Sequence, residues 1–318
     1  MAAIDPAGGP QISTLTGDSS FNPFEGVDFN ELEKSLRRPR TLTNILLTWL
    51  VSGMTLIALV PLFSVICMLL WRGGRKLSLA IFTQLPPAPL EQGGGFGNAI
   101  LGTIIIVVLA ALISVPLGIL SAIFMAQAPD GNRLASAVRF AAKVLTGFPS
   151  ILAGVFAYGV VVLAAGGFSA IAGAVAVSIL MLPTIMLTAE DAIRMVPAKM
   201  KEAAIGMGAT NTQTALMVLL PTAFPGILTG IMLAVARAAG ETAPLLFTSL
   251  FSSYWPSSGH HLNLMQPTAS LAVLIYNFAA MPFQNQVEMA WAAALVMVLM
   301  VLVTNLIGQS LSRRQVQS

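Results

Sequence analysis

The chain has 318 residues, of which 56% are hydrophobic and only 9% are charged, and its formal net charge is +3. Soluble domains carry about one quarter charged residues, so this composition excludes an ordinary soluble protein and indicates an integral membrane protein. The small net charge gives no reason to expect a nucleic-acid partner. The single cysteine, Cys67, excludes an intrachain disulfide and is expected to be a small apolar residue within an apolar run.

The N-terminal stretch, residues 1–43, is mostly polar and rich in Gly, Pro, Asp and Ser. It lacks the early apolar run of a signal peptide. We expect a cytoplasmic and largely disordered tail here.

Six later stretches are apolar and long enough to be transmembrane helices, which need about 20 such residues. The predicted spans are residues 44–71, 98–126, 147–165, 167–189, 216–240 and 286–309. An amphipathic segment, 133–146, precedes the third span. The sequence thus predicts an all-α membrane protein with an extracytoplasmic loop 72–97, a core 98–310 and a cytoplasmic C-terminal tail 311–318.

The basic residues predict the orientation of these spans, because lysine and arginine collect on the cytoplasmic side. With both termini inside, twelve lie in cytoplasmic segments, three lie outside in 72-RGGRK-76, and Arg237 lies in or at the end of a span. The chain is therefore expected to lie in the plasma (inner) membrane with both termini cytoplasmic. The pattern offers no physical reason for the exception at 72–76.

The long outer segment 241–285 contains a further apolar stretch, 268–281, which is too short for an ordinary span. We expect a surface or re-entrant helix there. The same segment holds His260 and His261, which we interpret as loop residues rather than metal ligands because no third ligand accompanies them.

A polar island, residues 190–215, interrupts the apolar pattern on the predicted cytoplasmic side. Glu190 and Arg194 have the spacing of a helix ion pair, and Pro197 should end the preceding helix. A short helix over 199–207 should then close at Gly206 and Gly208, since glycine enters the left-handed conformation easily. The stretch 210-TNTQ-213 predicts a capping box that starts the next helix.

This island resembles the coupling loop of ABC importer permeases. The segment 202-EAAIGMG-208, followed after nine residues by 218-VLLP-221, matches the family's EAA…G…I-LP pattern, with Val218 where isoleucine is usual. The resemblance implies the type I permease fold with a cytoplasmic coupling helix that docks on a partner ATPase. It assigns that contact to Glu202, Ala203, Ala204 and Gly208.

The stretch 236-ARAAGETAPLLFT-248 narrows the resemblance to PstA-type subunits of phosphate ABC importers, over roughly residues 44–310. The resemblance implies a PstC-type second permease, a PstB-type ATPase dimer and a PstS-type extracytoplasmic binding protein as partners, with phosphate as substrate. No cofactor is expected. The chain is not expected to be an enzyme, because no G-x-x-x-x-G-K-[ST] loop is present to hold ATP.

Arg237 and Glu241 are the chemically informative pair of that stretch. A charge at membrane depth costs about 2.5–3.5 kcal/mol on insertion scales, so it must meet a partner or an aqueous path. One interpretation is a purely structural ion pair. The other is a substrate site in which Arg237 binds phosphate oxygens, Glu241 accepts the hydrogen bond of a protonated phosphate and repels sulfate, and Thr242 donates its hydroxyl.

Three further alternatives remain open from the residues. The chain could be a permease for sulfate, molybdate or an organic solute, a secondary transporter with Glu241 as the coupling carboxylate, or a membrane enzyme. The last has little support, because the spans lack clusters of His, Cys and Asp.

Overall fold

The computed structural model describes residues 39–129, 131–258 and 261–316, and the predicted N-terminal tail falls almost entirely outside these residues. The chain divides into two units, Met1–Phe63 and Ser64–Ser318. Of the first unit, the structure describes the greater part of helix α1 (Pro39–Met68), which continues through Pro61 without ending. The helix begins five residues before the predicted span at 44, so residues 39–43 are not part of a tail.

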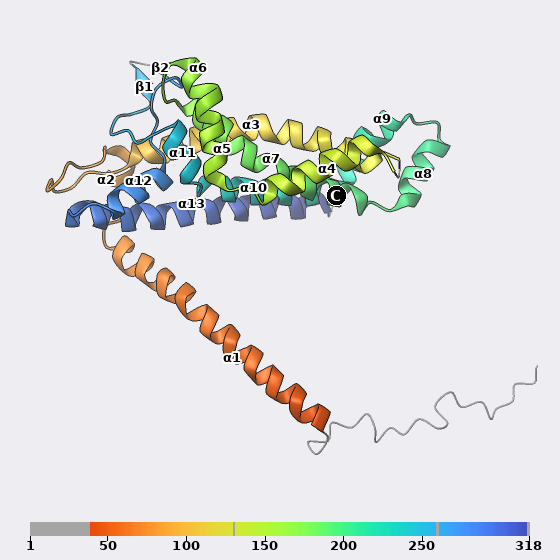
Figure 1. Cartoon of the computed structure of the whole chain (residues 1–318), viewed down its shortest axis with the longest axis horizontal. Helices are drawn as coiled ribbons and strands as arrows, with labels where there is room; N and C mark the ends of the chain where they lie inside the picture. Colours follow the sequence, from red (N-terminus) through yellow and green to blue (C-terminus); the bar gives the residue numbers. More distant parts are fainter. Residues whose placement is uncertain (1–38, 130, 259–260, 317–318) are drawn as a thin grey trace, which may run out of the picture. The chain divides into compact units, whose positions relative to one another are not determined.

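The second unit is helical, with the elements in Figure 1. Its long helices are α3 (Gly97–Gln127), α7 (Ala170–Arg194), α10 (Leu220–Ala239) and α13 (Gln284–Val316). Shorter helices connect them: α2 (Ala80–Thr83), α4 (Arg133–Thr146), α5 (Ser150–Ala157), α6 (Leu163–Ala165), α8 (Ala198–Gly206), α9 (Asn211–Thr214), α11 (Ala243–Thr248) and α12 (Leu271–Ala279). Three π-helical turns, η2 (Leu69–Gly73), η3 (Tyr158–Val162) and η4 (Ala215–Leu219), continue α1, α5 and α9. The strands β1 (Ser257–Ser258) and β2 (His261–Leu262) form one antiparallel pair.

Five helical segments of the described chain are long and apolar enough to cross a membrane. They are Arg40–Gly73, Gly97–Gln127, Ala170–Arg194, Asn211–Ala239 and Gln284–Ser310. The predicted third span corresponds to a broken element, since Arg133–Thr146 and Ser150–Ala165 meet at an angle of 105°. Pro149, between the two helices, prevents one continuous helix. The prediction of six spans is met if this bent pair counts as one.

Helix α7 occupies the centre of the second unit. It packs against α3, α10, α4, α5 and α11, and 67% of its most apolar window is buried. Its buried side chains are mostly small, which allows the neighbouring backbones to approach closely. Val177, Met181 and Ile185 of α7 form one core with Ile106 of α3 and Leu245 of α11.

Two predicted boundaries or placements differ from the structure. Helix α7 runs to Arg194, as the predicted helix pair of Glu190 and Arg194 and the stop at Pro197 require, but α13 runs to Val316, so residues 311–316 are helical and not a tail. The apolar stretch 268–281 contains α12, and of the two predicted alternatives the structure excludes a surface helix, because Leu271 and Leu274 are fully buried. Helix α12 packs on α13 and α3, which explains how an apolar run too short to span a bilayer is nevertheless buried.

Candidate functional site

Arg237 and Glu241 form an ion pair at the end of α10. The Nε of Arg237 donates to Oε1 of Glu241 at 3.2 Å. The arginine side chain is 42% exposed in the isolated chain, whereas that of Glu241 is 14% exposed. The pair therefore leaves much of the guanidinium, with its other N–H donors, facing outward from this subunit.

A helix break lies beside this pair. Helix α10 ends at Ala239, Gly240 follows as its C-terminal cap, and α11 begins at Ala243. The carbonyl of Thr242 accepts from the N–H groups of Leu245 and Leu246 at 3.1 Å each. Thr242 thus starts α11, and its half-buried side chain follows Glu241 directly at the break.

Helix α5 contacts the residues that follow this break. Gly154 lies so close to Pro244 that a Cβ atom at position 154 would stand 2.6 Å from the Pro244 Cα. Only a residue without a side chain permits this approach. The position of the 240–244 segment is therefore fixed by a backbone contact between α5 and α11.

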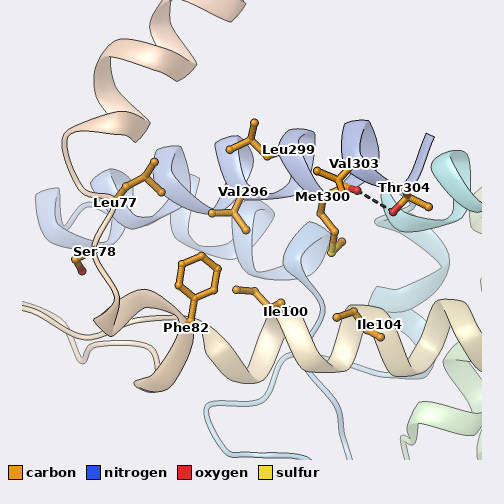
Figure 2. A pocket seen from close by; sticks show the side chains of 10 residues that line it. All are labelled: Leu77, Ser78, Phe82, Ile100, Ile104, Val296, Leu299, Met300, Val303 and Thr304. Atoms are coloured by element: carbon orange, nitrogen blue, oxygen red, sulfur yellow. Dashed lines mark hydrogen bonds between the residues drawn. The ribbon is translucent and has the colours of Figure 1, made fainter. Parts of the chain in front are cut away.

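The largest cavity among those described does not belong to the ion pair. It has a volume of about 570 Å³ and lies between α3 and α13, with Phe82, Ile100 and Met300 in its lining (Figure 2). Its remaining lining residues are Leu77, Ser78, Ile104, Val296, Leu299, Val303 and Thr304. No charged side chain lines it, so it offers no counter-charge to an anion.

The polar island forms the predicted helix, turn and helix. Pro197 caps α8, and Gly208 has φ +87°, the left-handed conformation that ends the segment. Gly206 is the last residue of α8 and does not adopt this conformation, so only one of the two predicted glycines makes the turn. The capping box is present in full: Thr210 Oγ1 accepts from the Gln213 N–H, and Gln213 Oε1 accepts from the Thr210 N–H at 2.9 Å.

The side chains of α8 divide between the protein and the surface. Glu202, Ala203 and Gly208 are exposed, as the coupling interpretation requires, but Ala204 is only 3% exposed. Ala204 therefore belongs to the inner face of the loop, where α8 packs on α9 and η4, and it is not available to a partner. Met207, which is 84% exposed, is an outward apolar residue that the sequence interpretation missed.

A charge cluster joins three helices of the core shortly before α8 begins. Glu190 of α7 is 3% exposed, and its carboxylate accepts from Arg139 Nε at 3.0 Å and from Arg194 Nε at 2.9 Å. Both arginines also donate to the carbonyl of Met125 near the end of α3, at 3.3 and 3.2 Å. The predicted helix pair of Glu190 and Arg194 is therefore part of a cluster that joins α3, α4 and α7, and its last residue, Arg194, lies four positions before α8 begins.

The structure also places two other residues of the sequence analysis. Cys67 is a free and exposed thiol. His261 lies in β2, and His260 lies outside the described residues. Within the described ranges, no group of three His, Cys, Asp or Glu side chains could hold a metal ion.

Comparison with known proteins identifies the family. Residues 114–317 match the model of the binding-protein-dependent transport system inner membrane component. The chain is 39% identical over 238 residues to the phosphate transport system permease protein PstA of Yersinia pestis, covering 75% of this chain and 79% of the relative. The chain belongs to this family of permeases, as a PstA-type member.

Other relatives and solved structures agree with this family. The permease is 38% identical over 247 residues to PstA of Xylella fastidiosa, covering 77% of this chain and 84% of the relative. It is 34% identical over 265 residues to the probable phosphate transport system permease protein PstA of Methanocaldococcus jannaschii, covering 83% of this chain and 91% of the relative.

Among solved structures, a bacterial alginate ABC transporter in complex with an alginate-bound periplasmic protein matches with a TM-score of 0.61 at 18% identity, covering 86% of this chain and 96% of that chain. The inward-facing MetNI methionine ABC transporter matches with a TM-score of 0.55 at 19% identity, covering 69% of this chain and 93% of that chain. These matches confirm the fold of an ABC importer permease.

Proposed function

We propose that this permease forms half of the membrane path of an ATP-driven phosphate importer, with a second permease subunit forming the other half. The single observation that carries the substrate assignment is the Arg237–Glu241 pair, set at a helix break with the guanidinium 42% exposed and the carboxylate 14% exposed. The names of the relatives, which are phosphate permeases, support the same substrate.

The chemistry of the pair suits hydrogen phosphate. A guanidinium stays charged and presents a planar fork of donors that matches two phosphate oxygens. Because only Arg237 Nε is engaged with Glu241, the terminal nitrogens can serve the anion. A phosphate near neutral pH still carries a proton, which Glu241 can accept as a hydrogen bond, whereas sulfate offers no such proton and meets only repulsion. The Thr242 hydroxyl is the third proposed contact.

A low affinity of this site for phosphate suits the proposed function. A path that must release its cargo needs modest affinity, and one arginine per subunit meets that need better than a closed cage of donors. The partner permease would complete the path by covering the exposed side of Arg237.

The coupling role is assigned to the outward side of the α8 loop. Glu202 and Ala203 with the Gly208 turn, extended by Met207, would enter a cleft of a partner ATPase subunit on the cytoplasmic side. Ala204 is left out of this contact because it is buried within the chain. The Glu190 cluster would carry the displacement of α8 to α3, α4 and α7, since it bonds all three just before α8. An extracytoplasmic phosphate-binding protein would deliver the substrate at the opposite face.

The proposal is tested with the complete importer, reconstituted in vesicles with its ATPase and binding protein. We expect ATP-dependent uptake of radiolabelled phosphate, unaffected by excess sulfate and abolished without ATP. Uptake of sulfate at a similar rate would show that the importer is not specific for phosphate and accepts oxyanions more broadly. Uptake that follows an ion gradient in the absence of ATP would instead indicate a secondary transporter.

A further inference from the structure

The basic run 72-RGGRK-76, which the orientation of the spans leaves unexplained, is part of an ordered cluster in the second unit. We use the name basic–aromatic cluster for the side chains of Trp71, Arg72, Arg75, Lys76, Glu288 and Trp291. Together with Gln284 they line a cavity of about 310 Å³. Helix α13 begins here, at the end of the unit opposite α8 (Figure 1).

The backbone positions this cluster. At Gly73, the last residue of η2, a Cβ atom would stand 2.6 Å from the carbonyl oxygen of Trp291 and 3.0 Å from the Leu295 Cβ. The glycine thus lets η2 lie directly on α13, which places Arg72 beside Trp291. This close packing fixes the backbone beside Arg72 without any ligand.

The two arginines lie against aromatic rings. The Arg72 guanidinium carbon is 5.6 Å from the centroid of Trp291, and that of Arg75 is 4.5 Å from the centroid of Trp71. Such cation–π contacts fix the guanidinium through its face and leave the N–H donors at its edge available. Within the part of the chain that the structure describes, neither arginine has a carboxylate within salt-bridge distance.

Lys76 differs from the arginines because it already has a counter-charge. Its Nζ lies 2.7 Å from Glu288 Oε2, and Gln284 donates to Glu288 Oε1 at 3.3 Å. This ion pair closes one side of the cavity. The positive charge that remains for a ligand is therefore carried by Arg72 and Arg75.

The surroundings of the cluster indicate where such a ligand comes from. The apolar helical segment Arg40–Gly73 ends within the cluster, and Leu70 and Trp71 are 59% and 64% exposed. Exposed apolar side chains at the end of a span face lipid, and tryptophan gathers at the level of the lipid headgroups. A phosphate group beside this surface at this depth belongs to a phospholipid. Inorganic phosphate has no apolar part that could pack on the adjoining apolar side chains.

We propose that the basic–aromatic cluster binds the phosphodiester headgroup of an anionic membrane phospholipid. Arg72 and Arg75 donate to its non-bridging oxygens, and its acyl chains lie along the exposed side chains at the end of η2. The site explains basic residues on a side of the membrane where they are otherwise rare. It does not depend on what the permease transports.

The test uses the detergent-solubilised, delipidated importer complex and measures bound dioleoyl phosphatidylglycerol by native mass spectrometry. The variant is Arg72→Gln with Arg75→Gln. The matched control is Arg133→Gln with Lys143→Gln, which removes two exposed positive charges from α4. We expect the first variant to lose affinity by about tenfold or more and the control to bind as the wild type does. Arg72→Lys with Arg75→Lys should retain part of the binding, because the charge survives without the planar fork.

Two further probes separate the possible ligands. Dioleoylglycerol, which has the same acyl chains and no phosphate, should not bind at the site, and inorganic phosphate at millimolar concentration should not displace the phospholipid. Displacement by inorganic phosphate would make this a free-anion site and overturn the proposal. Unchanged lipid binding in the glutamine variant would also overturn it, and so would retention of lipid together with lost affinity for the extracytoplasmic binding protein, which would indicate a protein-docking surface.

Discussion

Arg139 of α4 and Glu190 of α7 are 51 positions apart in the sequence, and the Arg139 Nε donates to both carboxylate oxygens, at 3.0 and 3.1 Å. Arg194 donates to the same carboxylate, and both arginines reach the Met125 carbonyl. A helix end leaves its last carbonyls without intrahelical partners, and these donors satisfy one of them. The pair therefore ties the end of α3 to the helix that leads into the coupling loop.

Replacing Glu190 by glutamine should destabilise the permease. The buried side chain would lose its charge while two arginines still converge on it, and hydrogen bonds to charged groups contribute about 1.5–3 kcal/mol each. Glu288→Gln makes the same chemical change in a side chain that is 36% exposed, where an ion pair contributes about 1 kcal/mol at most. Thermal unfolding of the purified complex should show a clearly lower Tm for Glu190→Gln only. Equal Tm values would remove the structural role of the cluster.

The order of the charges in the Arg237–Glu241 pair should matter for transport. Arg237→Glu combined with Glu241→Arg keeps an ion pair but moves the cation from the last turn of α10 to the break that follows it, and puts a carboxylate where phosphate should pass. Two like charges about 4 Å apart repel by about 4 kcal/mol at an intermediate effective dielectric constant. We expect phosphate uptake to stay lost in cells that lack their own importer, while membrane assembly persists.

Arg237→Lys is the companion variant and should keep part of the uptake, since it conserves the charge and loses only the planar fork. Near-normal uptake by the charge-swapped protein would leave Arg237 as a structural partner of Glu241 and not a contact of the substrate.

The turn at Gly208 should be required for coupling. A side chain there would meet no atom within 4 Å, so valine acts only through the backbone, where the left-handed conformation costs a β-branched residue about 1–2 kcal/mol. Gly208→Val should lower ATP-driven uptake and weaken attachment of the ATPase. Gly206→Ala is the matched control, because Gly206 is helical and also has open space; it should transport normally. Normal uptake in both variants would contradict the docking role of this turn.

The contact between Gly154 and Pro244 should set the geometry of the anion site. Gly154→Ala would force α5 away from α11, because the new methyl group would stand 2.6 Å from the Pro244 Cα. We expect reduced phosphate uptake and a lower Tm. Gly159→Ala, five residues along in η3, meets nothing within 4 Å and should have little effect. A similar loss in both variants would point to a general effect of alanine in this segment.

The proposed orientation predicts which positions an impermeant thiol reagent can reach. In a Cys67→Ala background, a cysteine at Ser257 should be labelled from outside intact cells, and one at Ile205 should be labelled only after the membrane is opened. Both side chains are exposed in the chain, so burial does not account for a difference. External labelling at position 205 would reverse the topology.

Features governed by neighbouring residues were predictable from the sequence. The capping box of Thr210 and Gln213, the left-handed turn at Gly208 and the helix break after Ala239 each depend on a few adjacent side chains. The five long spans follow from apolar length alone. The resemblance to ABC importer permeases, carried by short motifs, is confirmed by the family match over residues 114–317.

Features governed by packing were not predictable. The Arg139–Glu190 contact depends on how α4 packs against α7, and no local pattern specifies that packing. The inward direction of Ala204 is set by how α8 lies on η4, since one step along a helix rotates a side chain by about 100°. The partner of Lys76 is Glu288, far along the chain, so the basic run at 72–76 had no visible explanation in its own surroundings.

The 42% exposure of the Arg237 side chain has a consequence for how the importer is made in the cell. In a subunit without its partner, this charged side chain would be only partly covered, and exposure of such a charge to lipid costs about 2.5–3.5 kcal/mol on insertion scales. In the proposed importer, pairing with the second subunit would cover this side chain, so the residue proposed to select the cargo would also favour assembly of the two subunits.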